Sequence, residues 1–227
     1  MKIFQDDRRL STRRRTRPTS RFEPAVENME GRQLLTGSGA AIFLEGSALV
    51  VVGSNNGDTG VVAMQKGSVD VQVSNAQGSD DDQFLASAVS SIWYYGGSGD
   101  NHFTNATSLT GYLFGGMGNN VLNGGSGTDY LYATSSGTNV LNAGSGTEFL
   151  QSFGNGVNYL NGGSGYDTIF TFAGTNHVVG GSGETFVLAI GGQNTIDGGT
   201  GYSIVYSFSS TDVIIPEQNE TVVHIGY

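Results

Sequence analysis

The stretch LNGGSGTDYLYATSSGTNVLNAGSGTEFLQ, from Leu122 to Gln151, contains nearly the same pattern twice. Each copy has a glycine-rich segment, one acidic residue and a leucine, and Leu122 and Leu141 are nineteen residues apart. Glycines every nine residues would break an α-helix. A meander of hairpins would need strands longer than three or four residues. The pattern therefore predicts a coil of 18–19 residues with two half-turns, each made of a turn and a short strand.

The apolar residue that follows each turn recurs at steps of nine or ten along the chain. One inward side chain per strand would stack on its equivalents, so that many coils bury a column that one coil alone cannot bury. Parallel pairing between successive coils would satisfy the backbone hydrogen bonds. The predicted column contains Phe103, Leu113, Leu122, Leu131, Leu141, Leu150, Leu160, Ile169, Val178, Val187, Ile196 and Val205, and Leu85 and Tyr94 extend it toward the N-terminus.

The turns read GGSG or a close variant. GGSGTDYLY at Gly124–Tyr132 and GGSGYDTIF at Gly162–Phe170 match the pattern G-G-x-G-x-D-x-U-x at every fixed position. Over about residues 78–206 the chain resembles the RTX nonapeptide, or haemolysin-type calcium-binding repeat. The resemblance implies an all-β fold: a right-handed parallel β-roll, or β-solenoid, of 18–19-residue coils, each with two nonapeptide half-turns, closed by β caps.

In that family the carboxylate at the sixth repeat position and turn carbonyls of two stacked coils bind Ca²⁺. Calcium takes six to eight oxygen ligands, and glycine turns let backbone carbonyls approach the ion. Carboxylates one coil apart, about 4.8 Å, repel each other unless a cation lies between them. By this resemblance the metal ligands are Asp129, Glu148, Asp167, Gly125, Gly127, Gly144, Gly146, Gly163 and Gly165, with Asp58 in a candidate first turn.

The opposite edge of the coil departs from the family pattern, because asparagine replaces the acid. Stacked amides can donate and accept hydrogen bonds up a column without an ion. For the acidic edge the alternative to bound calcium is a solvated, weakly repelling row of carboxylates. The asparagine positions are Asn101, Asn120, Asn139, Asn158, Asn176 and Asn194.

Residues that flank each inward rung should point outward, and one face is rich in aromatic residues. We expect this face to bind a partner: another copy, a cell-surface polysaccharide, or the first 50–75 residues folded back. The alternative is that some of these rings turn inward. The predicted docking face contains Tyr130, Tyr132, Phe149, Phe170, Phe186, Leu188 and Tyr206.

Charge is distributed unevenly along the 227 residues. Residues 1–35 contain nine of the ten basic residues, whereas residues 36–227 contain fifteen acids and one base, Lys66. The acidic body repels nucleic acid and attracts cations. Cysteine is absent, which excludes disulfides and thiolate zinc sites. No stretch approaches 18 consecutive apolar residues, so no transmembrane helix is expected.

Residues 21–37, RFEPAVENMEGRQLLTG, resemble the LEPR-XLL segment of exported bacterial proteins. The resemblance lies in Glu23-Pro24, Glu30, Arg32 and Leu34-Leu35, although ENMEGRQLL departs from the usual motif. It implies secretion or display at a bacterial cell surface. We expect a basic, largely disordered leader at 1–37, an N-terminal cap with the first β coils at 38–77, the RTX-like β-roll at 78–208 and C-terminal cap strands at 209–227.

No catalytic centre is predicted. The three histidines have no ligand spacing, no nucleophile elbow is present, and the body has too few basic residues for a polysaccharide lyase. The sequence therefore predicts an exported, non-catalytic calcium-binding β-roll with a structural or adhesive role. The alternative is a calcium-independent structural solenoid or adhesin held by leucine and asparagine ladders. A third possibility is ice or polysaccharide binding on a regular outer face.

Overall fold

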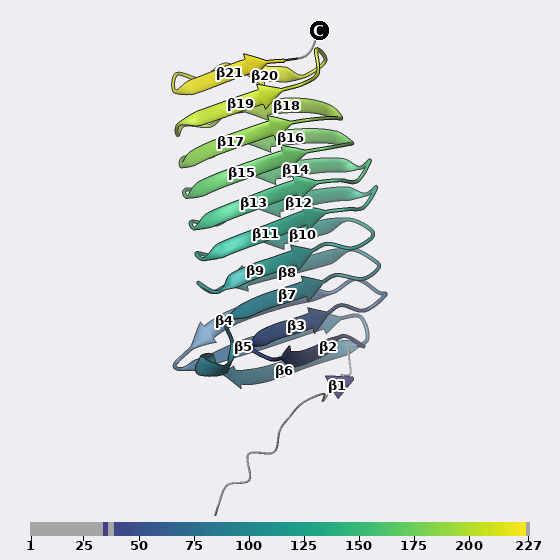
Figure 1. Ribbon diagram of the computed structural model, residues 1–227. Helices are drawn as coiled ribbons and strands as arrows, with labels where there is room; N and C mark the ends of the chain where they lie inside the picture. The colour runs from purple at the N-terminus through teal and green to yellow at the C-terminus, as the bar shows by residue number, and fades with distance from the viewer. Residues whose placement is uncertain (1–33, 36–38, 226–227) are drawn as a thin grey trace, which may run out of the picture.

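The computed structural model describes residues 34–35 and 39–225. Within them Leu34 and Leu35 form a short strand, and the rest of the predicted leader lies outside the described residues. The described chain is an all-β parallel solenoid of about seven turns with coils of about 19 residues, which confirms the predicted fold class (Figure 1). One 3-10 turn, η1 (Ala86–Ala88), interrupts the strands.

Two sheets form opposite walls of the solenoid. From β7 onward the chain alternates between them, and each strand pairs in parallel with the next strand of its own sheet. Sheet A contains, in spatial order, β1 (Leu34–Leu35), β2 (Ala41–Glu45), β3 (Ala48–Val52), β7 (Ser91–Tyr95), β9 (Thr110–Phe114), β11 (Thr128–Ala133), β13 (Thr147–Ser152), β15 (Tyr166–Thr171), β17 (Glu184–Ala189), β19 (Ser203–Ser207) and β21 (Glu220–His224). Sheet B contains β6 (Gly78–Leu85), β5 (Ser68–Asn75), β4 (Thr59–Gln65), β8 (Asn101–Ala106), β10 (Asn120–Asn123), β12 (Thr138–Asn142), β14 (Val157–Asn161), β16 (Thr175–Val179), β18 (Gln193–Asp197) and β20 (Val213–Ile215).

The aliphatic column lies between the two sheets as predicted. In sheet A, Leu131 pairs with Leu150, and Leu150 pairs with Ile169. In sheet B, Leu122 pairs with Leu141 in the same way. All twelve rungs from Phe103 to Val205 are at most 1% exposed. The stacking that one coil cannot achieve alone is therefore the core of the protein.

More side chains point inward than the single rung per strand that the sequence predicts. In β11 the buried residues are Asp129, Leu131 and Ala133, and the same alternation recurs in β13, β15 and β17. These strands have six residues, and alternate side chains of a strand point to the same face. The carboxylates at the sixth repeat position therefore lie inside the solenoid. The alternative prediction, a solvated row of carboxylates at the acidic edge, is wrong.

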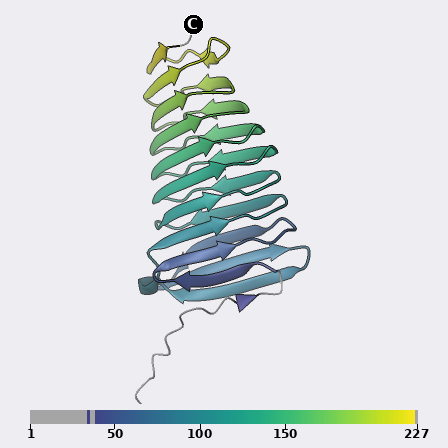
Figure 2. The ribbon, with the colours of Figure 1, turned by 45° about the vertical axis from the view of Figure 1, so that its right-hand side comes forward.

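The N-terminal end is built differently from the coils. Strands β2 and β3 form an antiparallel hairpin, and β4, β5 and β6 form an antiparallel meander (Figure 2). Leu85 ends β6 and is 71% exposed, so its predicted place in the column is wrong, whereas Tyr94 is buried there. Asp80, Asp81 and Asp82 lie on β6, the outermost strand of sheet B. Charged residues on an edge strand oppose pairing with another chain.

Candidate metal centre

Three acids on successive coils form what we call the acidic column: Asp129, Glu148 and Asp167. They pair in register on β11, β13 and β15, two residues before the leucine or isoleucine rung. Each follows a glycine turn that leads from sheet B into sheet A, and we call this side of the solenoid the acidic edge. Asp129 and Glu148 are fully buried and Asp167 is 2% exposed. Strand alternation alone places these charged groups in the interior.

The hydrogen bonds of the column are incomplete. Both Asp129 oxygens accept bonds, from the Gly125 amide at 2.7 Å and from the Asn105 side chain at 2.7 Å. Glu148 Oε1 accepts from the Gly146 amide and Asp167 Oδ2 from the Gly163 amide, each at 2.8 Å. Glu148 Oε2 and Asp167 Oδ1 are buried without a hydrogen-bond partner. Two adjacent coils thus each hold one carboxylate oxygen that no described donor satisfies.

Burial raises the pKa of every acid in the column. Desolvation, with the neighbouring Asp167 carboxyl, raises the pKa of Glu148 to about 8, and the Gly146 amide opposes this shift. Desolvation also raises the pKa of Asp167, against the Gly163 amide and the Glu148 carboxyl. For Asp129 desolvation raises the pKa, while the Gly125 amide and Asn105 lower it. The column therefore needs either a proton or a cation between its carboxyls.

The donor set fits a hard divalent cation. Carboxylate and carbonyl oxygens are the ligands that calcium prefers, and the two unpartnered oxygens face a desolvated interior. Within residues 34–35 and 39–225, no three His, Cys, Asp or Glu side chains meet at one point. An ion here would therefore take at most two carboxylates and complete its shell with backbone carbonyls or water.

The six predicted glycines lie beside the acidic column, and their carbonyls already have one partner each. The amides of the next coil donate to the carbonyls of Gly125, Gly127, Gly144, Gly146, Gly163 and Gly165 at 2.9–3.2 Å. A carbonyl oxygen has two lone pairs, so each keeps one for an ion. A Cβ at Gly144 would clash with the Gly125 carbonyl oxygen, so the coils stack this closely only because the turn is glycine.

Asp58 is not brought together with the acidic column. It lies in the turn between β3 and β4, on the opposite side of the solenoid. Its carboxylate accepts hydrogen bonds from the Ser54 amide and hydroxyl and from the Asn75 side chain, the last at 2.7 Å. Protein donors thus already satisfy this buried acid.

The opposite, asparagine edge holds a continuous amide chain, which we call the asparagine ladder. Each Nδ2 donates to the Oδ1 of the asparagine one coil further toward the C-terminus, at 2.9–3.0 Å; the members are Asn101, Asn120, Asn139, Asn158, Asn176 and Asn194. The Asp58 amide donates to Asn101 Oδ1 at 3.1 Å. At the other end Asn194 Nδ2 donates to Asp212 Oδ1 at 2.8 Å. Each amide of the ladder thus both donates and accepts at least one hydrogen bond without an ion.

Sequence reasoning missed two residues at the ends of these columns. Asp212 follows Asn194 by 18 residues, the same step that separates Asn176 from Asn194, so the spacing alone could have found it. Asn105, which donates to Asp129, has no such periodic signal.

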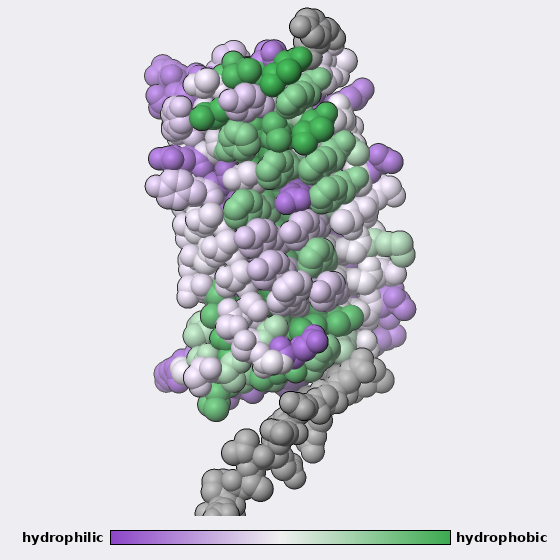
Figure 3. All heavy atoms as spheres, in the orientation of Figure 1, coloured by the Kyte–Doolittle hydropathy of each residue, from purple (hydrophilic) through white to green (hydrophobic). Residues whose placement is uncertain are grey.

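The aromatic face lies on the outer side of sheet A (Figure 3). The predicted face residues, Tyr130, Tyr132, Phe149, Phe170, Phe186, Leu188 and Tyr206, are all half-buried between the inward rungs. Ring centroids of Trp93, Tyr112, Tyr130 and Phe149 follow one another at 4.2, 4.9 and 4.8 Å. The rings are nearly parallel, so they cover one another's faces.

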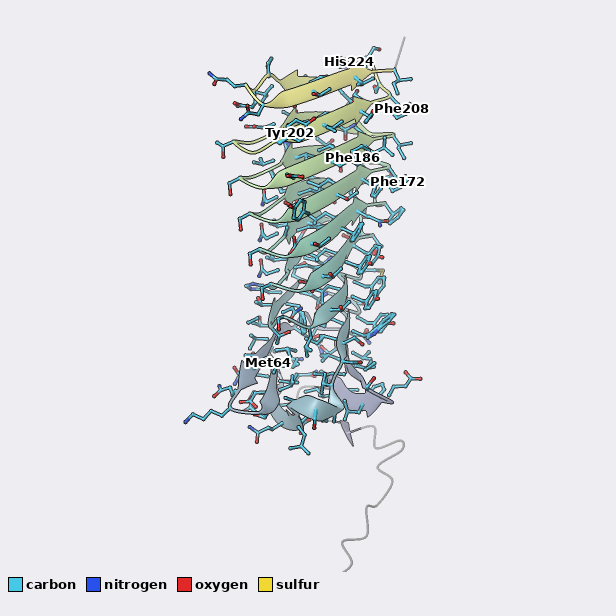
Figure 4. The ribbon with its side chains drawn as sticks, turned by 60° about the vertical axis from the view of Figure 1, so that its left-hand side comes forward. Met64, Phe172, Phe186, Tyr202, Phe208 and His224 are labelled. Carbon is cyan, nitrogen blue, oxygen red and sulfur yellow. The ribbon has the colours of Figure 1, made fainter. Side chains whose placement is uncertain are left out.

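An apolar ridge, which the sequence analysis did not identify, runs along the corner of sheet A. The first residue after each of five successive sheet A strands is apolar and 37–45% exposed: Phe153, Phe172, Ile190, Phe208 and Ile225. Figure 4 labels Phe172 and Phe208 on this corner. Phe153 and Phe172 stack at 4.7 Å.

Parallel coils, glycine turns and buried sixth-position acids define a repeat protein of the β-solenoid class. Residues 110–135, 154–187 and 189–218 match the RTX calcium-binding nonapeptide repeat, in four copies. The chain therefore carries RTX calcium-binding repeats. Comparison with curated proteins found no match, and comparison with solved structures found none. In the described part of the chain, no helix has the length and hydrophobicity to cross a membrane.

Proposed function

We propose that this chain is an exported calcium-binding protein, non-catalytic, with a structural or adhesive role at the bacterial cell surface or outside the cell. The observation that supports calcium binding is the pair of buried, unpartnered oxygens, Glu148 Oε2 and Asp167 Oδ1, inside an RTX-type stack. The RTX repeats and the LEPR-XLL-like segment support export.

The ion would be held between the Glu148 and Asp167 turns, and a second between the Asp129 and Glu148 turns. Glu148, Asp167 and Asp129 would supply the carboxylates, and the turn glycines would supply carbonyls. A bound Ca²⁺ supplies positive charge that removes the carboxylate repulsion and the cost of their desolvation. The chain's own part is to align the coils, which the aliphatic column does.

The test is thermal unfolding of the full chain, followed by circular dichroism, in EGTA and in excess CaCl₂. We expect calcium to raise Tm, and Asp167→Asn to remove most of that rise. Glu45→Gln, an exposed acid on the N-terminal hairpin, is the matched control and should keep the full rise. Equal Tm values in both buffers, with no heat of binding in calorimetry, would refute calcium binding.

A calcium-independent structural solenoid is the second candidate, and the asparagine ladder favours it. Half of the coil turns are already satisfied by amide hydrogen bonds alone. Under this alternative the chain is fully folded in EGTA, and calcium changes neither its spectrum nor its Tm. The same two unfolding curves therefore separate the candidates.

For the docking face we propose a second copy of the chain as the partner. Among the outward positions of the sheet A strands β9, β11, β13, β15, β17 and β19, Glu184 is the one charged residue, so this face holds little charge to oppose the approach of a second copy. Polysaccharide is less suited, because the stacked rings already cover the faces that a sugar would contact. In sedimentation experiments the double variant Phe149→Ser/Phe170→Ser should associate more weakly than the parent chain. A parent chain that is monomeric at every concentration tested would refute the proposal.

A further inference from the structure

Two tyrosines at the start of sheet A strands, Tyr166 in β15 and Tyr202 just before β19, do not follow the stacking pattern of their neighbours. Tyr166 is 62% and Tyr202 is 51% exposed, the largest values among the aromatic rings of the described residues. In that same part of the chain neither ring stacks on another. With Glu184 and Phe186 they line a hollow of about 210 Å³ on the outer face, where β15, β17 and β19 begin. Figure 4 labels Phe186 and Tyr202 of this lining. Aromatic and apolar side chains with a few polar groups are the usual lining of a ligand site.

The strand register places a carboxylate between the two rings. Tyr166 pairs with Glu184, and Thr185 pairs with Ser203, so Tyr202 is level with Glu184 on the next coil. Coils are about 4.8 Å apart, so the two tyrosine positions are about 10 Å apart with Glu184 midway. A group seated level with Glu184 is about 5 Å from the backbone of each tyrosine, measured along the stack. Attraction between a cation and a ring face extends to about 6 Å, so a tyrosine ring turned toward such a group can attract it.

The chemistry of the lining selects the ligand. Glu184 supplies one negative charge at the rim, and Phe186 and Ile204 supply an apolar wall. A hydrated metal ion gains nothing from aromatic and aliphatic walls, whereas a quaternary ammonium group gains from both the rings and the carboxylate. The hollow is below the range of drug-sized pockets, about 300 Å³ and more, so it suits a single small head group.

We propose that Tyr166, Glu184 and Tyr202, with Phe186 at the wall, form a binding site for an organic ammonium cation of the choline type. The acidic surface of the body raises the local concentration of such cations. The site does not depend on the proposed calcium function, because Glu184 is an exposed residue outside the acidic column. Asp167 and Thr185 also line the hollow, so calcium and ammonium ligands must be tested separately.

The experiment is a choline titration of the full chain, followed by line broadening and saturation transfer in proton NMR. We expect saturable binding with a Kd of about 1 mM. The neutral isostere 3,3-dimethylbutan-1-ol, which has the same shape without the charge, should show no saturable binding. Equal binding of both compounds, or no saturation by choline, would overturn the proposal.

Variants locate the binding site. Glu184→Gln and Tyr202→Leu should each weaken choline binding about 3- to 10-fold, because each removes one attractive group. Glu45→Gln and Tyr159→Leu remove an exposed acid and an exposed ring elsewhere and should bind choline like the parent chain. Calcium binding by Glu184→Gln should be unchanged. If Glu184→Gln keeps full choline affinity, or if it loses calcium while keeping choline, the assignment is wrong.

Discussion

The acidic edge and the asparagine edge occupy equivalent positions of the same coils and solve the same problem differently. At both edges the sixth residue of the nonapeptide repeat is buried and stacks on its equivalent one coil away. An amide both donates and accepts, so six asparagines close a chain of hydrogen bonds on their own. An ionised carboxylate only accepts, so Glu148 and Asp167 leave two oxygens without a partner. The two edges therefore differ in the number of hydrogen-bond donors that their side chains provide, and not in backbone geometry.

Buried acids at the asparagine edge support this interpretation. Asp58 and Asp212 lie at the two ends of the asparagine ladder, and both are nearly inaccessible to solvent. Each is satisfied by protein donors: Ser54 and Asn75 for Asp58, and Asn194 and Ser207 for Asp212. A buried carboxylate is therefore tolerated here when donors surround it, and it calls for a cation when they do not.

The largest effect is expected from giving the asparagine edge an acid. Asn139→Asp removes the donor to Asn158 and places an ionised group between two amides. We expect a loss of about 3 kcal/mol in unfolding free energy at pH 7, since an unmatched acceptor and a buried charge both cost energy. Urea unfolding measures this loss. The isosteric control Asn123→Asp, on the outer surface, should lose less, and equal losses would mean that burial does not matter.

The reverse exchange at the acidic edge should stabilise the chain without calcium. Glu148→Gln supplies an N–H donor beside Asp167 Oδ1 and removes one buried charge. We expect a gain of about 1–2 kcal/mol in EGTA at pH 8, together with weaker calcium binding. Urea unfolding in EGTA measures the change in unfolding free energy, and calorimetry with CaCl₂ measures the calcium affinity. A loss of stability in EGTA would show that the unpartnered oxygens are not the weak point.

A smaller effect is expected at the end of the ladder. Asp212 accepts from Asn194 and Ser207 through both oxygens. In Asp212→Asn one of these acceptors becomes a donor, so we expect a loss of about 1 kcal/mol, measured by urea unfolding. Glu217→Gln, an exposed acid in the same segment, is the control. An unchanged midpoint would mean that the ladder does not need an anionic end.

The smallest expected effect is the change of stability with pH in the absence of calcium. The pKa of Glu148, about 8 in the folded chain, is above its ordinary value of 4.5. Between these values the folded chain holds a proton that the unfolded chain has lost, so stability falls as pH rises through this window. Urea midpoints in EGTA should decrease from pH 5.5 to 8.5, and Glu148→Gln should flatten the slope. A midpoint that increases with pH would contradict a raised pKa.

Much of the architecture was predictable because a repeat needs little tertiary information. The twelve aliphatic rungs, the coil length and the two opposed edges all followed from the spacing of glycine and apolar residues. Leu85 was wrongly included because its spacing matches, although antiparallel pairing with β5 places it on an outer strand. Where the glycine-rich turns are missing, the spacing of apolar residues alone cannot distinguish a coil of the solenoid from an antiparallel hairpin.

The sequence by itself determined which residues stack, since a period of nine or ten fixes what lies above and below each side chain. It did not determine how long each strand is, and therefore that the acids share the inner face with the rungs, or which oxygens find donors. Because the strands have six residues, the acid two residues before each rung points inward with the rung. Donors such as Asn105 and Asn75 come from distant parts of the chain. Only the assembled coils decide hydrogen-bond satisfaction, because it depends on atoms that meet across the stack rather than along the chain.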